Sequence, residues 1–197
     1  MKTKILSLIV LFAVMTGSAK TTNAAVAANS NYTVLNDIKA INKIEVRGNV
    51  QLFISDNTPE QVTVYNKYYA QNALVQSKSG VLRISSYSAV KLVVWVSSQN
   101  LQSVSAYDNA EVRSFGDVAK IEFNIDLHNS AAAKLTFDAH SVRVTLRDNA
   151  TAELSGHIDE FGMDRNRGSM VLNSGLTVGR NIENKLIETG KDALIGA

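Results

Sequence analysis

Four consecutive windows of 18 or 19 residues decide the fold: LQSVSAYDNAEVRSFGDVA (101–119), KIEFNIDLHNSAAAKLTFD (120–138), AHSVRVTLRDNATAELSGH (139–157) and IDEFGMDRNRGSMVLNSG (158–175). The fourth position of each window, Val104, Phe123, Val142 or Phe161, opens a short run of alternating apolar and polar residues. Alternation of period 2 indicates a strand with one buried face. A polar break, a second short run and a second break follow. Each window therefore predicts strand, turn, strand, turn.

One such unit cannot bury its apolar face alone, so neighbouring units must stack. The sequence predicts an all-β, parallel β-helix-like solenoid with coils of about 19–20 residues. Asn109, Asn129 and Asn149 follow the first strand of their units, and we expect them to adopt the left-handed backbone of a turn and to form a side-chain ladder. An antiparallel meander would favour Asn-Gly or Asp-Gly turns, which the chain lacks. A leucine-rich repeat fits only residues 101–109.

Residues 1–24 read as a secretory signal peptide, with Lys2 and Lys4 before an apolar run that is too short to span a bilayer. We expect residues 25–37 to form a flexible leader and 38–197 a single domain. Without the signal peptide, 17 basic and 18 acidic residues remain, which argues against nucleic-acid binding. The chain has no Cys, so disulfides and thiolate metal sites are excluded. The sequence thus predicts a periplasmic or extracellular product without stable membrane insertion.

The β pattern begins before the repeats. Residues 44–54 predict two strands joined at 47–49, and further strands are expected at 61–65, 81–85 and 90–96. The last of these is nearly all apolar and is expected to be buried on both faces. Residues 67–76 suggest a short helix or an irregular crossing, and residues 181–190 a last coil or a cap.

Several segments together resemble the auto-transporter adhesin head GIN domain family: KIEVRGNV (43–50), QVTV (61–64), GVLRI (80–84), VVWV (93–96) and LQSVSA (101–106). The resemblance covers roughly residues 38–195. It implies an exported bacterial protein of the kind frequent in Bacteroidetes, with a right-handed parallel β-helix-like fold and no established catalytic residues. Many members carry Ser-Gly-Ala-Ser at the repeat turns. Here the turns read Asp-Asn-Ala, Asn-Ser-Ala, Asp-Asn-Ala and Arg-Gly-Ser.

The turns also supply the candidate binding residues. Stacked coils place equal turn positions above one another, about 4.8 Å apart, and a regular polar row suits a polymeric partner such as a glycan or envelope component. The predicted polar strip consists of Asp108, Asn109, His128, Asn129, Asp148, Asn149, Asn166 and Arg167. Tyr65, Tyr68, Tyr69 and Tyr87 offer an aromatic patch, although packing of the N-terminal segment is the favoured reading of these rings.

The sequence gives little support for a catalytic site or a metal site. His128, His140 and His157 lack metal-ligand spacing and are expected to be solvated turn residues. A calcium site on Asp108, Asn129 and Asp148 lacks the glycine-rich calcium repeat. The acid pairs Asp126 with Asp164 and Asp159 with Glu160 have no fixed separation in the sequence. We therefore predict no cofactor, no metal and no enzymatic activity.

Two function classes remain. The sequence favours a non-enzymatic, adhesin-like binding module of unknown oligomeric state. The alternative is a polysaccharide lyase or hydrolase, which rests only on the enzymes that other β-helices host. A cleft with clustered acids would favour the enzyme, and a flat polar face would favour the binder.

Overall fold

The computed structural model describes residues 31–56, 59–66 and 68–186, and the side chains of 183–185 are not described. The expected signal peptide lies outside these residues, as do the first part of the leader and the last residues of the expected cap. The fold is all-β, with a single turn of 3-10 helix, η1 (Tyr69–Gln71). The strands are β1 (Thr33–Leu35), β2 (Lys43–Gly48), β3 (Val50–Ser55), β4 (Gln61–Val64), β5 (Ala73–Lys78), β6 (Val81–Ser86), β7 (Leu92–Ser97), β8 (Ser103–Tyr107), β9 (Glu111–Val118), β10 (Glu122–Leu127), β11 (Ala132–Leu146), β12 (Thr151–Arg165), β13 (Met170–Leu172) and β14 (Leu176–Leu186).

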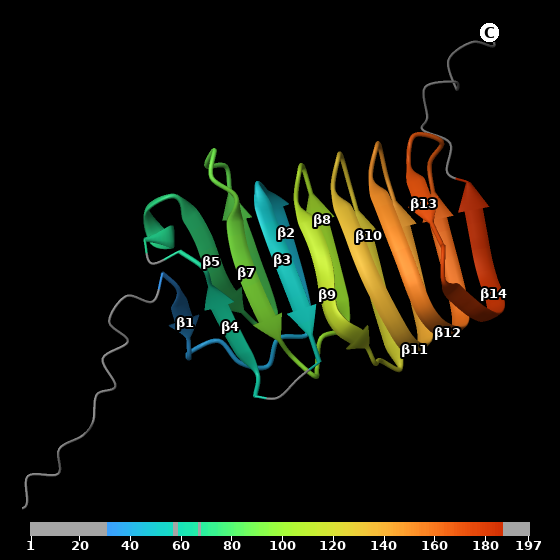
Figure 1. The fold of residues 1–197 in the computed structure, drawn as a ribbon, viewed down its shortest axis with the longest axis horizontal. Helices are drawn as coiled ribbons and strands as arrows, with labels where there is room; N and C mark the ends of the chain where they lie inside the picture. The colour runs from blue at the N-terminus through green and yellow to red at the C-terminus, as the bar shows by residue number, and fades with distance from the viewer. Residues whose placement is uncertain (1–30, 57–58, 67, 187–197) are drawn as a thin grey trace, which may run out of the picture.

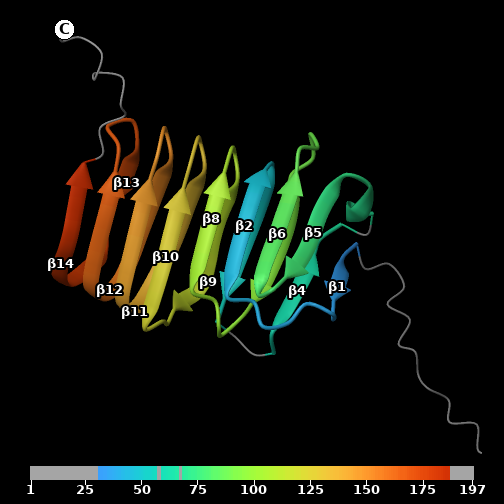
Figure 2. The same cartoon turned by 180° about the vertical axis from the view of Figure 1, so that it is seen from behind.

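These strands form one sheet that folds back on itself around the core. Strands β4, β7, β3 and β9, continued by the first halves of β11 and β12 and by β13, form the layer nearer the viewer in Figure 1. Strands β5, β6, β2, β8 and β10, continued by the second halves of β11 and β12 and by β14, form the layer nearer the viewer in Figure 2. We call these the first layer and the second layer. β11 and β12 each contribute to both layers. In these two coils, one continuous strand therefore connects the first layer to the second.

The sheet is mixed, which corrects the expectation of a solenoid that is parallel throughout. Pairing is parallel from β6 and β7 to the C-terminal end of the stack. At the N-terminal end, β1 with β4, β4 with β7 and β5 with β6 pair antiparallel. Residues 25–37 were expected to form a flexible leader, but Thr33–Leu35 within this segment form β1. Residues 67–76, expected as a helix or crossing, contain η1 and the start of β5.

The repeat is visible in the register of the C-terminal coils. Phe123 lies opposite Val142, and Val142 opposite Phe161, as the 19-residue period predicts. Val104, however, lies opposite Ile125 and not opposite Phe123. The offset arises in β9, where the partners of Lys134 and Thr136 are Arg113 and Asp117, so β9 carries two extra residues in a bulge. Gly116 lies in this bulge with φ 80°, a backbone conformation that glycine adopts readily.

The order of the coils does not follow the sequence. β2 lies between β6 and β8, and β3 lies between β7 and β9. The coil that the chain forms first is therefore inside the stack, and the segment between β7 and β8 passes over its start. The buried Ser98 hydroxyl fixes this crossing, 2.8 Å from the Ile41 carbonyl oxygen and 2.9 Å from Glu60 Oε1.

The Glu60 carboxylate ties the same crossing to the backbone. It accepts the N–H groups of Ala40 and Ile41 at 2.8 and 2.9 Å. Burial raises the pKa of this carboxyl, but the bonds from Ile41, Ala40 and Ser98 outweigh burial, so its pKa lies below the ordinary value. A carboxylate that stays charged can thus hold three donors at the point where the chain crosses itself.

The core lies between the two layers. Phe123 and Phe137 are almost fully buried, and their ring centroids lie 6.0 Å apart. The burial pattern of β7 alternates, which corrects the expectation that residues 90–96 are buried on both faces. Val94 and Val96 point into the core, and Val93 and Trp95 face outward and are partly exposed. The outward side of the first layer therefore carries large side chains.

Candidate functional site

The predicted polar strip lies along one edge of the stack. The turns between β8 and β9, β10 and β11, β11 and β12, and β12 and β13 stand side by side along the upper edge in Figure 1. We call this edge the turn row. The structure thus brings together the segments that contain all eight predicted residues. Their side chains differ in exposure and in what they contact.

A ladder of hydrogen bonds joins neighbouring turns. Asp148 Oδ2 accepts the N–H of Asn129 at 3.0 Å, and Asn129 Oδ1 accepts the N–H of Asp108 at 3.3 Å. The Tyr87 hydroxyl donates to Asp108 Oδ2 at 3.0 Å, and this bond is the main reason that the pKa of Tyr87 lies above its ordinary value. Asp148 and Asn129 therefore satisfy backbone N–H groups of the preceding coil, which is a structural role.

Two of the three turn residues with a left-handed backbone lie one position before the predicted residue. Asp108, Asn129 and Asp148 have φ between 57° and 63°, whereas Asn109 and Asn149 do not adopt positive φ. Only Asn129 was predicted correctly, because in the other two turns Asp and Asn are adjacent and both tolerate a left-handed backbone. The ladder itself exists, but two of its three members are aspartates.

Other residues of the polar strip also make contacts within the protein. The His128 ring stacks on the Tyr107 ring with centroids 4.8 Å apart, and His128 Nε2 lies 3.0 Å from Asp126 Oδ1. Arg47 covers the other side of this group, with Cζ 3.7 Å from the Tyr107 centroid. Asn166 is buried and accepts the N–H of Ser169 at 3.1 Å. The exposed members of the strip are Asn109, Asn129, Asp148, Asn149 and Arg167, and two of them, Asn129 and Asp148, belong to the ladder.

A second surface lies on the outward side of the first layer. Tyr65 follows β4, Trp95 lies in β7, Phe53 in β3 and Phe115 in β9, and their rings form one chain of contacts. The centroids lie 6.5 Å apart for Tyr65 and Trp95, 5.1 Å for Phe53 and Trp95, and 4.9 Å for Trp95 and Phe115. Tyr32 extends the chain, 5.9 Å from Tyr65. We call these five residues the aromatic row.

The aromatic row is open to solvent. Tyr32 is 44% exposed, Tyr65 50% and Phe115 56%, and Phe53 and Trp95 are half-buried between them. Phe115 belongs to the bulge of β9 described above. Contiguous exposed apolar patches of this kind are typical of interaction surfaces.

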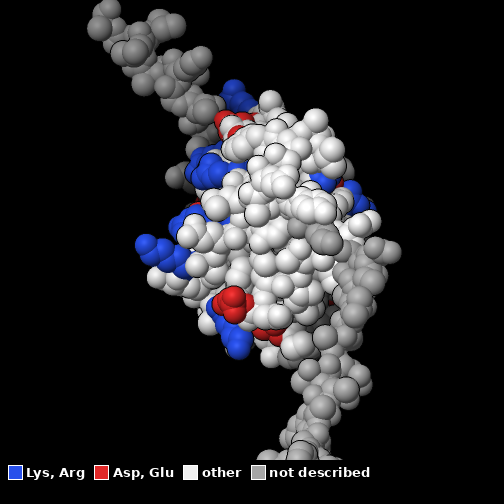
Figure 3. Space-filling model, turned by 90° about the vertical axis from the view of Figure 1, so that its left-hand side faces the viewer, with Lys and Arg blue, Asp and Glu red and all other residues white. Residues whose placement is uncertain are grey.

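The tyrosines of the predicted patch separate in the structure. Tyr65 belongs to the aromatic row, Tyr69 packs against the core, and Tyr87 joins the turn ladder. Tyr68 is exposed near η1, at the N-terminal end of the stack. Figure 3 looks onto this end, and the described residues at its centre are neither acidic nor basic. The sequence analysis did not single out Tyr32, Phe53, Trp95 or Phe115.

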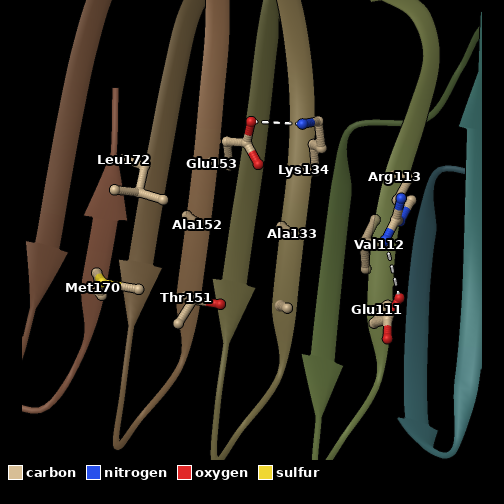
Figure 4. A pocket seen from close by; sticks show the side chains of 11 residues that line it. Glu111, Val112, Arg113, Ala133, Lys134, Thr151, Ala152, Glu153, Met170 and Leu172 are labelled. Carbon is tan, nitrogen blue, oxygen red and sulfur yellow. Dashed lines mark hydrogen bonds and ion pairs between the residues drawn. The ribbon is translucent and has the colours of Figure 1, made fainter. Parts of the chain in front are cut away.

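A shallow hollow lies on the same outward side, further along the stack. Its volume is about 310 Å³, and small side chains at Ala132 and Thr151 form its floor. Figure 4 shows Met170 and Leu172 at one end and Glu111 with Arg113 at the other. Lys134 and Glu153 border it as an ion pair, 2.6 Å apart.

The proposed acid pairs have partners of their own. Asp126 contacts His128, and Asp164 lies 3.9 Å from Arg143. Asp159 lies between His140 and His157, at 2.9 and 3.1 Å, and the bonds from His140 and then His157 lower its pKa. Glu160 pairs with Arg180. In the described part of the chain, no group of three or more His, Cys, Asp or Glu side chains is placed to hold a metal ion.

The geometry defines an all-β protein of stacked strands with two regular surfaces, the turn row and the outward side of the first layer. Within residues 31–56, 59–66 and 68–186, no helix has the length and apolar character needed to cross a membrane. Residues 40–183 match the family described as putative auto-transporter adhesin, head GIN domain. The chain belongs to this family, as the sequence resemblance predicted.

Two solved structures are similar in fold. A putative adhesin from Parabacteroides distasonis has 17% identity and a TM-score of 0.55, over 76% of this chain and 75% of that one. A putative adhesin from Parabacteroides merdae has 13% identity and a TM-score of 0.57, with the same coverage. No curated protein matches the chain. Family membership supports an exported or surface protein with a non-enzymatic binding role.

Proposed function

We propose that this protein is a non-enzymatic binding module of the adhesin type, exported to the periplasm or the cell surface, which contacts a glycan or another envelope polymer. The aromatic row carries the proposal. Five rings joined by a chain of contacts, three of them in separate strands and two next to strand ends, provide a broad, partly exposed apolar platform at low conformational cost. The parallel coils behind it are proposed to wind right-handed, as parallel crossovers do.

The turn row remains a second contact surface in this proposal, limited to its exposed members outside the ladder. Asn109 and Asn149 occupy equivalent positions in two coils that flank the coil of Ser130, and both are exposed. Asp108, Asn129 and Asp148 are engaged in the ladder, so a ligand would have to compete with backbone bonds for them. The aromatic row is free of this competition and is therefore the main proposed site.

The test uses the single tryptophan of the chain. Because Trp95 lies in the aromatic row, its fluorescence reports ligand contact at the site directly. The full exported chain is titrated with purified envelope polysaccharides, and the same samples are analysed for cleavage products. We expect saturable binding that changes Trp95 fluorescence and yields no products.

The variant Trp95→Ala, followed by calorimetry, should bind at least tenfold more weakly, a loss of about 1.4 kcal/mol. Ile121→Ala is the matched control, because Ile121 is 83% exposed but lies in the turn between β9 and β10, outside the row. Unchanged binding by a folded Trp95→Ala protein would refute the site. Cleavage products would refute the non-enzymatic role.

A further inference from the structure

The aromatic row and the hollow lie on one continuous surface. In the first layer, Phe53 of β3 is in register with Trp95 of β7 and with Arg113 of β9. Arg113 is in register with Lys134, and Lys134 with Glu153 and then Leu172. All of these residues alternate outward, so one row of side chains runs from the aromatic rings across the strands to the border of the hollow.

A neighbouring row has the same direction. Gln51, Glu111, Ala132, Thr151 and Met170 are in register across β3, β9, β11, β12 and β13. Two small residues in its middle, Ala132 and Thr151, create the hollow. With strands about 4.8 Å apart, the distance from β7 to β13 is about 24 Å. A ligand that contacts both ends must be an extended chain.

The charges on this surface are paired with one another. Glu111 accepts from Lys91 at 2.5 Å, which is the main reason that its pKa is lowered, and it also contacts Arg113 and the Gln51 amide. Lys134 pairs with Glu153. Three basic groups and two carboxylates leave a net charge of only about +1, so this surface offers little net attraction to a polyanion or to a polycation. A neutral chain rich in hydroxyl groups can donate to the carboxylates and accept from the bases without breaking these pairs.

We propose that the outward side of the first layer binds a linear, neutral glycan that lies across the strands, with one part on the aromatic row and another in the hollow over Ala132 and Thr151. The inference rests on the proposed function and extends it by naming the ligand class and a second subsite. The hollow is at the lower end of the size of small-molecule sites. Along β3 and β9, Phe53 and Phe115 alternate with the polar outward residues Gln51 and Arg113, which favours a polar ligand over a lipid surface.

The experiment compares short and long ligands on the full exported chain. Disaccharides and hexasaccharides of glucose, mannose, xylose and N-acetylglucosamine are titrated, with hexagalacturonate as the charged probe and phosphatidylcholine vesicles as the lipid probe. Trp95 fluorescence reports the aromatic row, and calorimetry gives the affinity. At least one neutral hexasaccharide should bind tenfold or more tightly than its disaccharide, because the second subsite adds contacts.

Thr151→Gln fills the hollow without adding charge. It should weaken hexasaccharide binding at least tenfold and leave the disaccharide response at Trp95 unchanged. Thr145→Gln is the matched control, because Thr145 is an outward residue of the second layer. Its affinity should equal that of the natural chain.

Hexasaccharide binding that depends on Trp95 but is unaffected by Thr151→Gln would overturn the second subsite and leave the proposed function standing. Tighter binding of hexagalacturonate than of every neutral hexasaccharide would overturn the neutral ligand class. Binding to vesicles with no response to any oligosaccharide would overturn both this inference and the glycan function.

Discussion

The turn row and the aromatic row are both regular, yet they use their side chains in opposite ways. In the turn row, conspicuous polar residues face the next coil and bond to its backbone. In the aromatic row, large apolar residues face solvent and contact one another. Repeated residues in a stacked protein therefore indicate first the contacts that hold neighbouring coils together. Large apolar residues that remain exposed are better indicators of a binding surface.

The largest expected effect comes from removing the ladder. Replacing Asp108, Asn129 and Asp148 together by Ala should lower the free energy of unfolding by roughly 3 kcal/mol, since ladder bonds are lost and Ala is placed at positive φ. Thermal unfolding should show a Tm lower by about 9 °C. The Asn129→Gly variant serves as a control, because glycine keeps the backbone conformation and loses only the side-chain bond.

The same triple variant also tests whether the turn row binds the ligand. If it unfolds at the natural temperature but no longer binds any polysaccharide, the turn row is the binding site and its bonds have no structural weight.

A smaller effect is expected in the aromatic row. Phe115→Ala should weaken polysaccharide binding about fivefold, or about 1 kcal/mol, without a change in Tm, since the ring is more than half exposed and contacts Trp95. Phe115→Tyr keeps the ring and should restore the affinity. Loss of stability without loss of affinity in Phe115→Ala would make this ring a packing residue. Calorimetry and thermal unfolding together distinguish the two cases.

The smallest effect concerns pH at the end of the ladder. The pKa of Tyr87 is raised by its bond to Asp108, so the bond stabilises the fold fully below the unfolded pKa of about 10 and is lost as pH rises through the higher folded pKa. Titration of tyrosinate absorbance should show one tyrosine that ionises late. In Asp108→Asn, which removes the charge beside Tyr87, this late ionisation should shift to lower pH. A Tyr87 that titrates normally in the natural chain would contradict the bond.

The features of the fold that depend on local sequence pattern could be predicted from the sequence. The all-β fold, the strand-turn-strand units and the stacking of Phe123, Val142 and Phe161 all follow from periods that a single chain segment contains. The position of Val104 could not be predicted, because the bulge in β9 adds two residues without interrupting the alternation around it. The placing of β2 and β3 inside the stack depends on which distant strands fit together, and no local pattern encodes that choice.

The aromatic row was not predicted from the sequence, because its rings lie in or next to different strands that are far apart in the chain. One signal was available. In β3, Leu52 and Ile54 are in the buried phase, so Phe53 must point outward with Gln51. In β7, Trp95 shares its phase with Val93 and Ser97, and the run 90–96 is nearly all apolar because the outward residues Val93 and Trp95 are apolar too. An apolar ring in the outward phase of a strand is the pattern to search for.

The position of β2 and β3 inside the stack has a consequence for how the molecule assembles. This coil is made early in synthesis and has two open edges, one that β6 and β7 later occupy and one that β8 and β9 occupy. In the folded stack it is therefore the junction between an N-terminal end with antiparallel strands and a C-terminal end with repeated parallel coils. Each C-terminal coil pairs only with its neighbours, so a coil added at that end would leave the pairing of β2 and β3 unchanged.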